Sequence, residues 1–138
     1  MAEASPHKLP TASLRFPDGK TITVDVARTP KTREIGLMFR DSLPADYGML
    51  FVFSNEGGMQ FWMKNTWVDL DMLFIDGKKR VTVIHENVPR SSPDTPEPNI
   101  ARRGGVGQYV LELPAGAASK YGLKAGRALF FDVAIPAE

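Results

Sequence analysis

Lys64, Asn65 and Thr66 form a short polar run between two strongly apolar segments of the chain. A polar group buried in apolar surroundings must be hydrogen-bonded, because leaving it unpaired costs roughly 1–3 kcal/mol. The run is therefore either a paired structural network or a binding or catalytic site. Thr66 fits the structural alternative, in which its hydroxyl satisfies backbone groups of a turn. For Lys64 and Asn65 both alternatives stay open.

Two carboxylates, Asp69 and Asp71, follow Lys64 by five and seven residues. This spacing is short enough for an ammonium–carboxylate contact across a strand–turn–strand unit. An Asp71 held by Lys64 is either a positioned base or a structural strut, and the sequence does not decide between them. In an enzyme, one of the aspartates would act as base, with Lys64 as electrostatic stabiliser and Asn65 as oxyanion donor.

Arg33 and Arg40 flank the apolar side of a predicted short helix. If both turn toward the polar run, their guanidinium groups form a fork for a carboxylate or phosphate, and otherwise they belong to a solvated helix face. Trp62 lies in a concentration of methionine and aromatic residues, whose ordinary role is core packing. Exposed indoles of Trp62 and Trp67 would instead provide an adaptable apolar groove or a docking surface.

Composition excludes several function classes. The 17 basic and 16 acidic side chains give a net charge of +1, which argues against nucleic acid as a partner. The chain has no cysteine and only two, widely separated histidines, so we predict no metal site. The glycines of residues 104–107 neither follow a predicted strand nor open a helix, and no other nucleotide-binding loop is present, so we predict no cofactor.

The location of the protein stays open at this point. No apolar run approaches the roughly 20 residues of a membrane helix, so we predict no membrane span. Residues 1–10 are polar, contain proline and have no apolar signal segment. We interpret them as a disordered lead, which fits both a cytoplasmic protein and a periplasmic or envelope protein whose export signal has been removed. A protein partner and an oligomeric state are not predicted.

Alternating apolar and polar residues predict a β-hairpin that turns at Pro17, Asp18 and Gly19. Thr29 and Pro30 are typical of an N-cap and first helical position, so we predict a short helix over residues 30–38. The next patterns predict a meander of strands over 49–53, 59–63, 70–75 and 81–86, in which residues 54–58 return the chain.

Residues 87–107 are rich in proline, serine and glycine, and predict a long loop that covers or borders the site or is a solvated excursion. A strand over 109–113, a helical turn over 115–120 and a closing strand over 129–134 follow. We expect the closing strand to return beside an early one and cover an edge. Together these elements predict one mainly β domain over residues 11–138, an antiparallel sheet curled into a small barrel or sandwich with two short helices.

Several motifs of this chain resemble the domain-of-unknown-function family 192. They are Arg33, Gly36, Leu37, Met38, Arg40, GMLFVF at 48–53, FWMKNT at 61–66, LDMLFID at 70–76, VLELPAG at 110–116 and GLKAG at 122–126. The resemblance implies a small, mainly β protein of bacteria or archaea, often exported, and it brings no catalytic residues. Two positions depart from the family pattern: Asp69 stands where proline is typical, and Arg127 where aspartate is usual.

The leading hypothesis from the sequence is a binding module that holds a small polar or anionic ligand at the polar run, assisted by Arg33 or Arg40. One alternative is a metal-independent hydrolase or lyase that uses Asp71, Lys64 and Asn65. Another is a protein-interaction module that docks a partner through its tryptophans. Whether the protein is an enzyme is not decided by the sequence.

Overall fold

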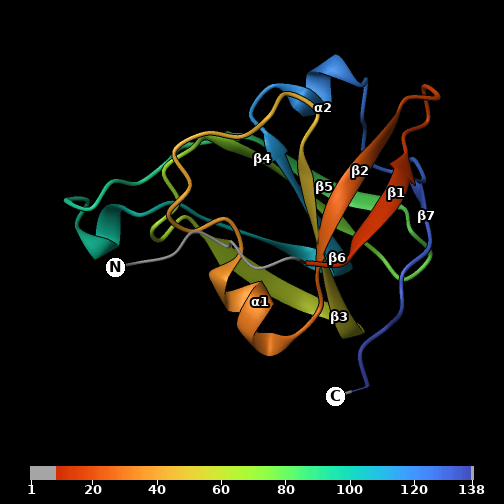
Figure 1. Cartoon of the computed structure of the whole chain (residues 1–138), viewed down its shortest axis with the longest axis horizontal. Coiled ribbons are helices and arrows are strands. Elements are labelled where there is room, and N and C mark those ends of the chain that lie inside the picture. Colours follow the sequence, from red (N-terminus) through yellow and green to blue (C-terminus); the bar gives the residue numbers. More distant parts are fainter. Residues whose placement is uncertain (1–8, 138) are drawn as a thin grey trace.

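The computed structural model describes residues 9–137. Seven strands form one sheet in the order β5-β4-β6-β3-β2-β1-β7, which curls into a half-barrel (Figure 1). The elements are β1 (Thr11–Arg15), β2 (Thr21–Ala27), α1 (Pro30–Ile35), β3 (Gly48–Trp62), β4 (Leu70–Ile75), β5 (Val81–Val88), the 3-10 helix η1 (Glu97–Asn99), β6 (Arg102–Pro114), α2 (Ala117–Lys120) and β7 (Phe130–Phe131). The predicted mainly β fold with two short helices is confirmed.

The N-terminal hairpin forms as predicted. β1 and β2 pair antiparallel, and the Asp18 carboxylate accepts a hydrogen bond from the Lys20 backbone N–H at 2.8 Å in the turn. β7 pairs antiparallel with β1 and so covers that edge, although it is shorter than the closing strand that we predicted. Most of the predicted disordered lead, residues 1–8, lies outside the described residues.

Two predicted strands, over 49–53 and 59–63, are in fact parts of the single strand β3. The register with β6 shifts between Val52 and Gly57, so residues 54–58 lie in an irregularity of the strand and do not return the chain. The prediction was wrong because the glycines there were interpreted as a turn. The long strand β6 pairs with β3 on both sides of the irregularity and keeps it extended.

The predicted meander holds for β4 and β5, which pair antiparallel, but it is wrong for β3 and β4, because β6 lies between them. β6 pairs antiparallel with both of these neighbours. Residues 63–69 therefore connect β3 to β4 although the two strands are not neighbours in the sheet. The predicted long loop is correspondingly shorter, since its glycine-rich end from Arg102 onward belongs to β6. A local pattern does not contain this information, because the pairing joins residues far apart in the sequence.

Gly105 allows β6 to lie close to its neighbours. A Cβ atom at this position would be 2.7 Å from side-chain atoms of both Phe74 and Val83, which is closer than real Cβ contacts allow. Gly58 of β3 has no such neighbour within 4 Å. Neither glycine needs a positive φ, so the two positions differ mainly in the space around them.

We therefore expect Gly105→Ala to lower the free energy of unfolding by about 1–3 kcal/mol, the usual cost of overpacking a well-packed core. Gly58→Ala is the matched control and should change it by less than about 0.5 kcal/mol, as substitutions without close contacts do. Urea denaturation at a single pH measures both. Equal effects of the two variants would contradict the steric explanation.

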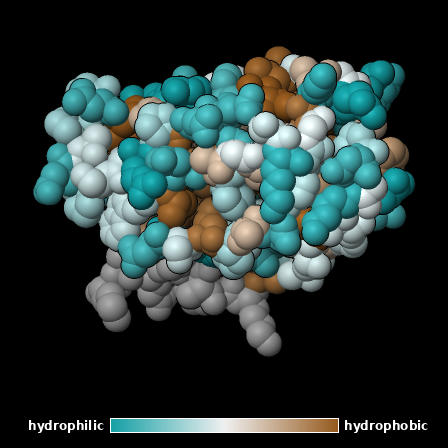
Figure 2. All heavy atoms as spheres, turned by 90° about the horizontal axis from the view of Figure 1, so that it is seen from above, coloured by the Kyte–Doolittle hydropathy of each residue, from teal (hydrophilic) through white to brown (hydrophobic). Residues whose placement is uncertain are grey.

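The sheet buries a separate apolar cluster on each face, because successive side chains of a strand point to opposite sides. On β3, Leu50 and Val52 belong to one cluster, while Met49 and Phe51 belong to the other. On the face shown in Figure 2, hydrophilic side chains predominate and hydrophobic ones gather in small separate patches. No helix within residues 9–137 is long and apolar enough to span a membrane.

α1 lies on the face of the sheet that buries Met49 and Phe51, at the opposite end of the molecule from α2 (Figure 1). β2 and β3 pair in parallel, which requires a crossover connection, and α1 is part of that crossover. Thr29 caps the helix as predicted, in a reciprocal capping box with Thr32. The helix ends at Ile35, earlier than predicted, and Gly36 (φ 49°) is its C-cap.

Candidate functional site

A cleft of about 790 Å³ lies between α1 with the residues that follow it and the strand β3. Its lining combines four aromatic rings with charged and amide side chains. The aromatic lining is Phe51, Phe53, Phe61 and Trp62, and the polar lining is Arg33, Glu34, Gln60, Lys64, Asn65, Thr66 and Glu112. A concave site of this size, in which polar groups converge beside an apolar wall, is a candidate for small-molecule binding.

The aromatic lining is held by edge-to-face contacts. The Phe61 ring lies 5.1 Å from the Phe51 ring and 6.1 Å from the Phe53 ring, nearly perpendicular to both. Such pairs contribute about 0.5–1.5 kcal/mol beyond burial and fix the ring planes. The cleft therefore offers a preformed apolar surface to a ligand.

The polar run forms a tight turn directly after β3. The Thr66 backbone N–H donates to the Met63 carbonyl at 3.1 Å, and the Thr66 hydroxyl donates to the Lys64 carbonyl at 3.0 Å. Asn65 has a φ of 53°, in the left-handed region that asparagine tolerates well. The Thr66 hydroxyl thus satisfies a backbone carbonyl of the turn, and all three residues of the polar run belong to the cleft lining.

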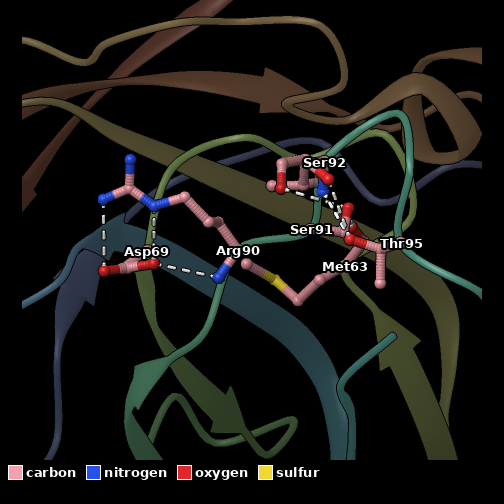
Figure 3. A network of polar contacts seen from close by, with 7 residues as sticks. Met63, Asp69, Arg90, Ser91, Ser92 and Thr95 are labelled. Atoms are coloured by element: carbon pink, nitrogen blue, oxygen red, sulfur yellow. Dashed lines mark hydrogen bonds and ion pairs between the residues drawn. The ribbon is translucent and has the colours of Figure 1, made fainter. Parts of the chain in front are cut away.

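A segment of the proline-rich loop holds this turn in place. The Ser91 backbone N–H donates to the Thr66 carbonyl at 2.9 Å, and the buried Ser91 hydroxyl donates to the Met63 carbonyl. Figure 3 shows the contact between Ser91 and Met63 beside the hydrogen bonds between Ser92 and Thr95 that shape the loop. The loop supports the turn from behind, since none of its residues lines the cleft.

Lys64 lies against the indole ring of Trp62. Its Nζ is 5.0 Å from the ring centroid, and the Arg102 guanidinium lies 4.9 Å from the same ring. Each cation–π contact stabilises its cation by about 0.5–1 kcal/mol at an exposed site. Within residues 9–137, Lys64 makes no ion pair and its ammonium donates no hydrogen bond to protein. Its charge is therefore available to a ligand.

The two arginines named from the sequence do not form a fork. Arg33 lines the cleft, where its guanidinium donates to the carbonyls of Arg28 and Val52 at 2.9 and 3.1 Å. Arg40 is not part of the lining, and its guanidinium lies 5.1 Å from the Tyr47 ring centroid. Only Arg33 adds its positive charge to the cleft.

Asp71 lies on the other face of the sheet from the cleft. It is fully buried, and its carboxylate accepts backbone hydrogen bonds from Asn87 at 2.9 Å, Gly116 at 3.1 Å and Ala118 at 2.9 Å. It thereby joins β4 to the end of β5 and to the start of α2. Asp71 does not contact Lys64, and its geometry is that of a structural strut.

Asp69 also lies outside the cleft, in a pair with Arg90 (Figure 3). The Arg90 Nε donates to Asp69 Oδ1 at 3.0 Å, and the Arg90 backbone N–H donates to the same atom at 2.9 Å. These bonds hold the pKa of Asp69 below its usual range. No group of three or more acidic or histidine side chains in the described part of the chain is arranged to hold a metal ion.

Glu34, Gln60 and Glu112 are polar cleft residues that sequence reasoning did not name as site candidates, and Glu112 is the buried one. It lies on β6 where this strand pairs with Met49 of β3 and Met72 of β4, and it is only 5% exposed. Burial raises the pKa of its carboxyl to about 8. The available signal was a single acidic residue inside the apolar run VLELP, where a solvated glutamate has no place.

The tryptophans are both half-buried, and neither belongs to an apolar core cluster. Trp62 lines the cleft, whereas Trp67 contacts the Phe39 ring edge-on at 5.6 Å. The Trp67 indole N–H is buried and has no hydrogen-bond partner among the described residues. The two indoles therefore do not form one continuous surface.

Comparisons with known proteins give a family and two similar structures. Residues 14–131 match the model of the domain-of-unknown-function family 192, described as "Uncharacterized ACR". A crystal structure of a candidate transcription regulator from Sinorhizobium meliloti has a TM-score of 0.79 and 35% identity, over 91% of this chain and 96% of that one. A protein of unknown function from Novosphingobium aromaticivorans has a TM-score of 0.72 and 27% identity, over 94% and 93% of the two chains. No curated protein matches the chain.

Proposed function

Since this chain belongs to the domain-of-unknown-function family 192, whose matched residues 14–131 contain the entire cleft, we propose from the cleft itself that the protein is a binding module for a small anionic ligand with an apolar body. The observation that carries this proposal is Lys64, a residue of the cleft lining whose ammonium makes no ion pair with the described residues and lies against the ring of Trp62, another lining residue. The cation–π contact with Trp62 does not neutralise the charge of the Lys64 ammonium, because the indole ring is uncharged.

The charge of the lining favours an anion over a cation. Lys64 and Arg33 carry positive charge, whereas Glu34 is the one lining carboxylate that is exposed. The amide of Asn65 offers a further donor, because only one of its two Nδ2 hydrogens is used, in a 4.0 Å bond to the Met38 sulfur. A carboxylate or a similar acidic group therefore finds both charge and hydrogen-bond donors at the polar turn.

The apolar part of the ligand is matched by the aromatic lining. Phe51, Phe53 and Phe61 form a packed wall of the cleft. A ring or a branched alkyl group placed against this wall would have its apolar surface removed from contact with water. Burial of apolar surface supplies about 25 cal/mol per Å². Aromatic carboxylates are therefore the ligand class that we would test first.

The enzyme alternative requires Asp71 and Lys64 to share a cavity, and they lie on opposite faces of the sheet. The interaction-module alternative requires a joint surface of two tryptophans, and only Trp62 lies at the cleft. Both alternatives therefore have less support than ligand binding.

A thermal-shift screen with aromatic carboxylates tests the proposal. A ligand at 100 times its dissociation constant should raise the free energy of unfolding by about 2.7 kcal/mol. Lys64→Met keeps the apolar part of the side chain and removes the charge, so it should weaken binding roughly tenfold.

Lys124→Met is the matched control, because Lys124 is exposed and remote from the cleft lining, and it should bind like the unmodified protein. The proposal fails if no carboxylate in the screen stabilises the protein. It also fails if Lys64→Met and Lys124→Met bind such a ligand equally well.

A further inference from the structure

Glu112 presents a carboxyl group to the cleft from an otherwise apolar position. Its strand neighbours in register, Met49 and Met72, are fully buried, and Val110, two residues earlier on the same face of β6, belongs to the same apolar cluster as these methionines. Yet Glu112 lines the cleft together with Phe51 and Lys64. The carboxyl is therefore more than nine-tenths buried and borders the space that a ligand would fill.

No described residue forms a hydrogen bond or an ion pair with the Glu112 side chain. A carboxylate in such surroundings would be a buried charge without a partner, which is far more costly than the neutral acid. Burial accordingly raises the pKa of this group to about 8. Near neutral pH Glu112 is mostly a protonated acid, which carries one O–H donor that the protein leaves unused.

The charged groups around Glu112 come from the other walls of the cleft. α1 contributes Arg33 and Glu34, and the turn after β3 contributes Lys64. β4 contributes none on this face, because Asp71 points to the opposite side and is held there by backbone N–H groups. Two of these three charged side chains are positive, which disfavours a ligand cation in the cleft and does not oppose a neutral oxygen acceptor at Glu112.

Building on the proposed binding of an anionic ligand, we propose that the Glu112 carboxyl donates a hydrogen bond to an oxygen acceptor at the far end of that ligand. The ligand is then an oxo acid: an acidic group lies at Lys64, an apolar middle lies on the phenylalanines, and a carbonyl oxygen meets Glu112. Such a site rejects an isostere that lacks the oxygen, because the buried donor would stay unpaired.

The test uses two probes of nearly equal shape, 4-acetylbenzoate and 4-isopropenylbenzoate, which differ in a carbonyl oxygen against a methylene group. Titration calorimetry measures both dissociation constants at about pH 6.5 and about pH 9.5, on either side of the titration of Glu112. At the lower pH the unmodified protein should bind the acetyl compound roughly fivefold more tightly. At the higher pH the ionised carboxylate no longer donates, and this preference should disappear.

Two variants separate a donor from a merely structural side chain. Glu112→Gln keeps an N–H donor without a titrating proton, so its preference for the acetyl compound should persist at both pH values. Glu112→Leu should show no preference at either pH. Rescue by glutamine with loss of the pH dependence is a result that a packing role alone would not give.

The possible failures are distinguishable. If both probes bind equally well at the lower pH and Lys64→Met weakens both, the binding module stands and the role of Glu112 is overturned. A preference for the acetyl compound that increases with pH would also overturn it, because the ionised group would then be the favourable one. If neither probe binds at millimolar concentration, the oxo-acid inference fails, and the thermal-shift screen with other aromatic carboxylates decides the proposed function separately.

Discussion

Asp71→Ala is expected to lower the free energy of unfolding by about 3–5 kcal/mol, because it removes a buried acceptor of three backbone hydrogen bonds. The N–H groups of Asn87, Gly116 and Ala118 would lose their partner in a part of the protein that water reaches poorly. The join between β4, the end of β5 and the start of α2 would loosen together. Urea denaturation followed by circular dichroism measures the loss.

Two further substitutions make this expectation specific. Asp71→Asn keeps one acceptor oxygen but turns an amide N–H₂ toward a backbone donor, so its loss should be intermediate. Asp69→Ala removes an exposed pair with Arg90, and such pairs contribute only about 0–1 kcal/mol. A loss for Asp71→Ala as small as that for Asp69→Ala would show that the strut is not important for stability.

Glu112→Gln is expected to make the protein more stable above pH 8 by roughly 3–5 kcal/mol. The folded state raises the pKa of Glu112 from 4.5 to about 8, so between these values the folded protein holds a proton that the unfolded chain releases. The stability that Glu112 contributes is therefore complete below about pH 4.5 and is lost as the pH rises toward 8. Glutamine does not titrate and avoids this loss.

The measurement is a series of denaturation curves from about pH 5 to about pH 9 for the unmodified protein and the variant. The difference between them should be within about 1 kcal/mol at the acidic end and should grow with pH. Glu86→Gln, an exposed glutamate on β5, is the control and should change stability by less than about 0.5 kcal/mol throughout. If the difference in free energy of unfolding between Glu112→Gln and the unmodified protein stayed constant with pH, the raised pKa of the buried Glu112 carboxyl would be contradicted.

Local signals in the sequence predicted the local structure well. Asp18 and Gly19 specified the first turn, and Thr29 with Pro30 specified the start of α1, because turns and caps depend on neighbouring residues. The position of β6 between β3 and β4 was not predictable in this way. The glycines of β6 were interpreted as part of a loop. In the structure Gly105 lies within the strand, where Phe74 and Val83 occupy the space that a side chain would need.

The same distinction explains the cleft. Four of the predicted site candidates come together in one cleft: Arg33, Trp62, Lys64 and Asn65. Asp71 was grouped with Lys64 because they are close in sequence, but the side-chain alternation of β4 directs it to the other face. Glu112 was missed because only the pairing of β6 with β3 brings it to a cleft whose other residues lie between positions 30 and 66.

The central place of β6 in the sheet has a consequence for biosynthesis. β3 and β4 leave the ribosome before the strand that pairs with both of them, since β4 ends at Ile75 and β6 runs from Arg102 to Pro114. At a translation rate of about 5–20 residues per second, their unpaired, methionine- and phenylalanine-rich edges wait roughly 2–8 seconds for β6. We expect the nascent chain to be most prone to aggregation during that interval, and to depend then on whatever chaperones the cell provides.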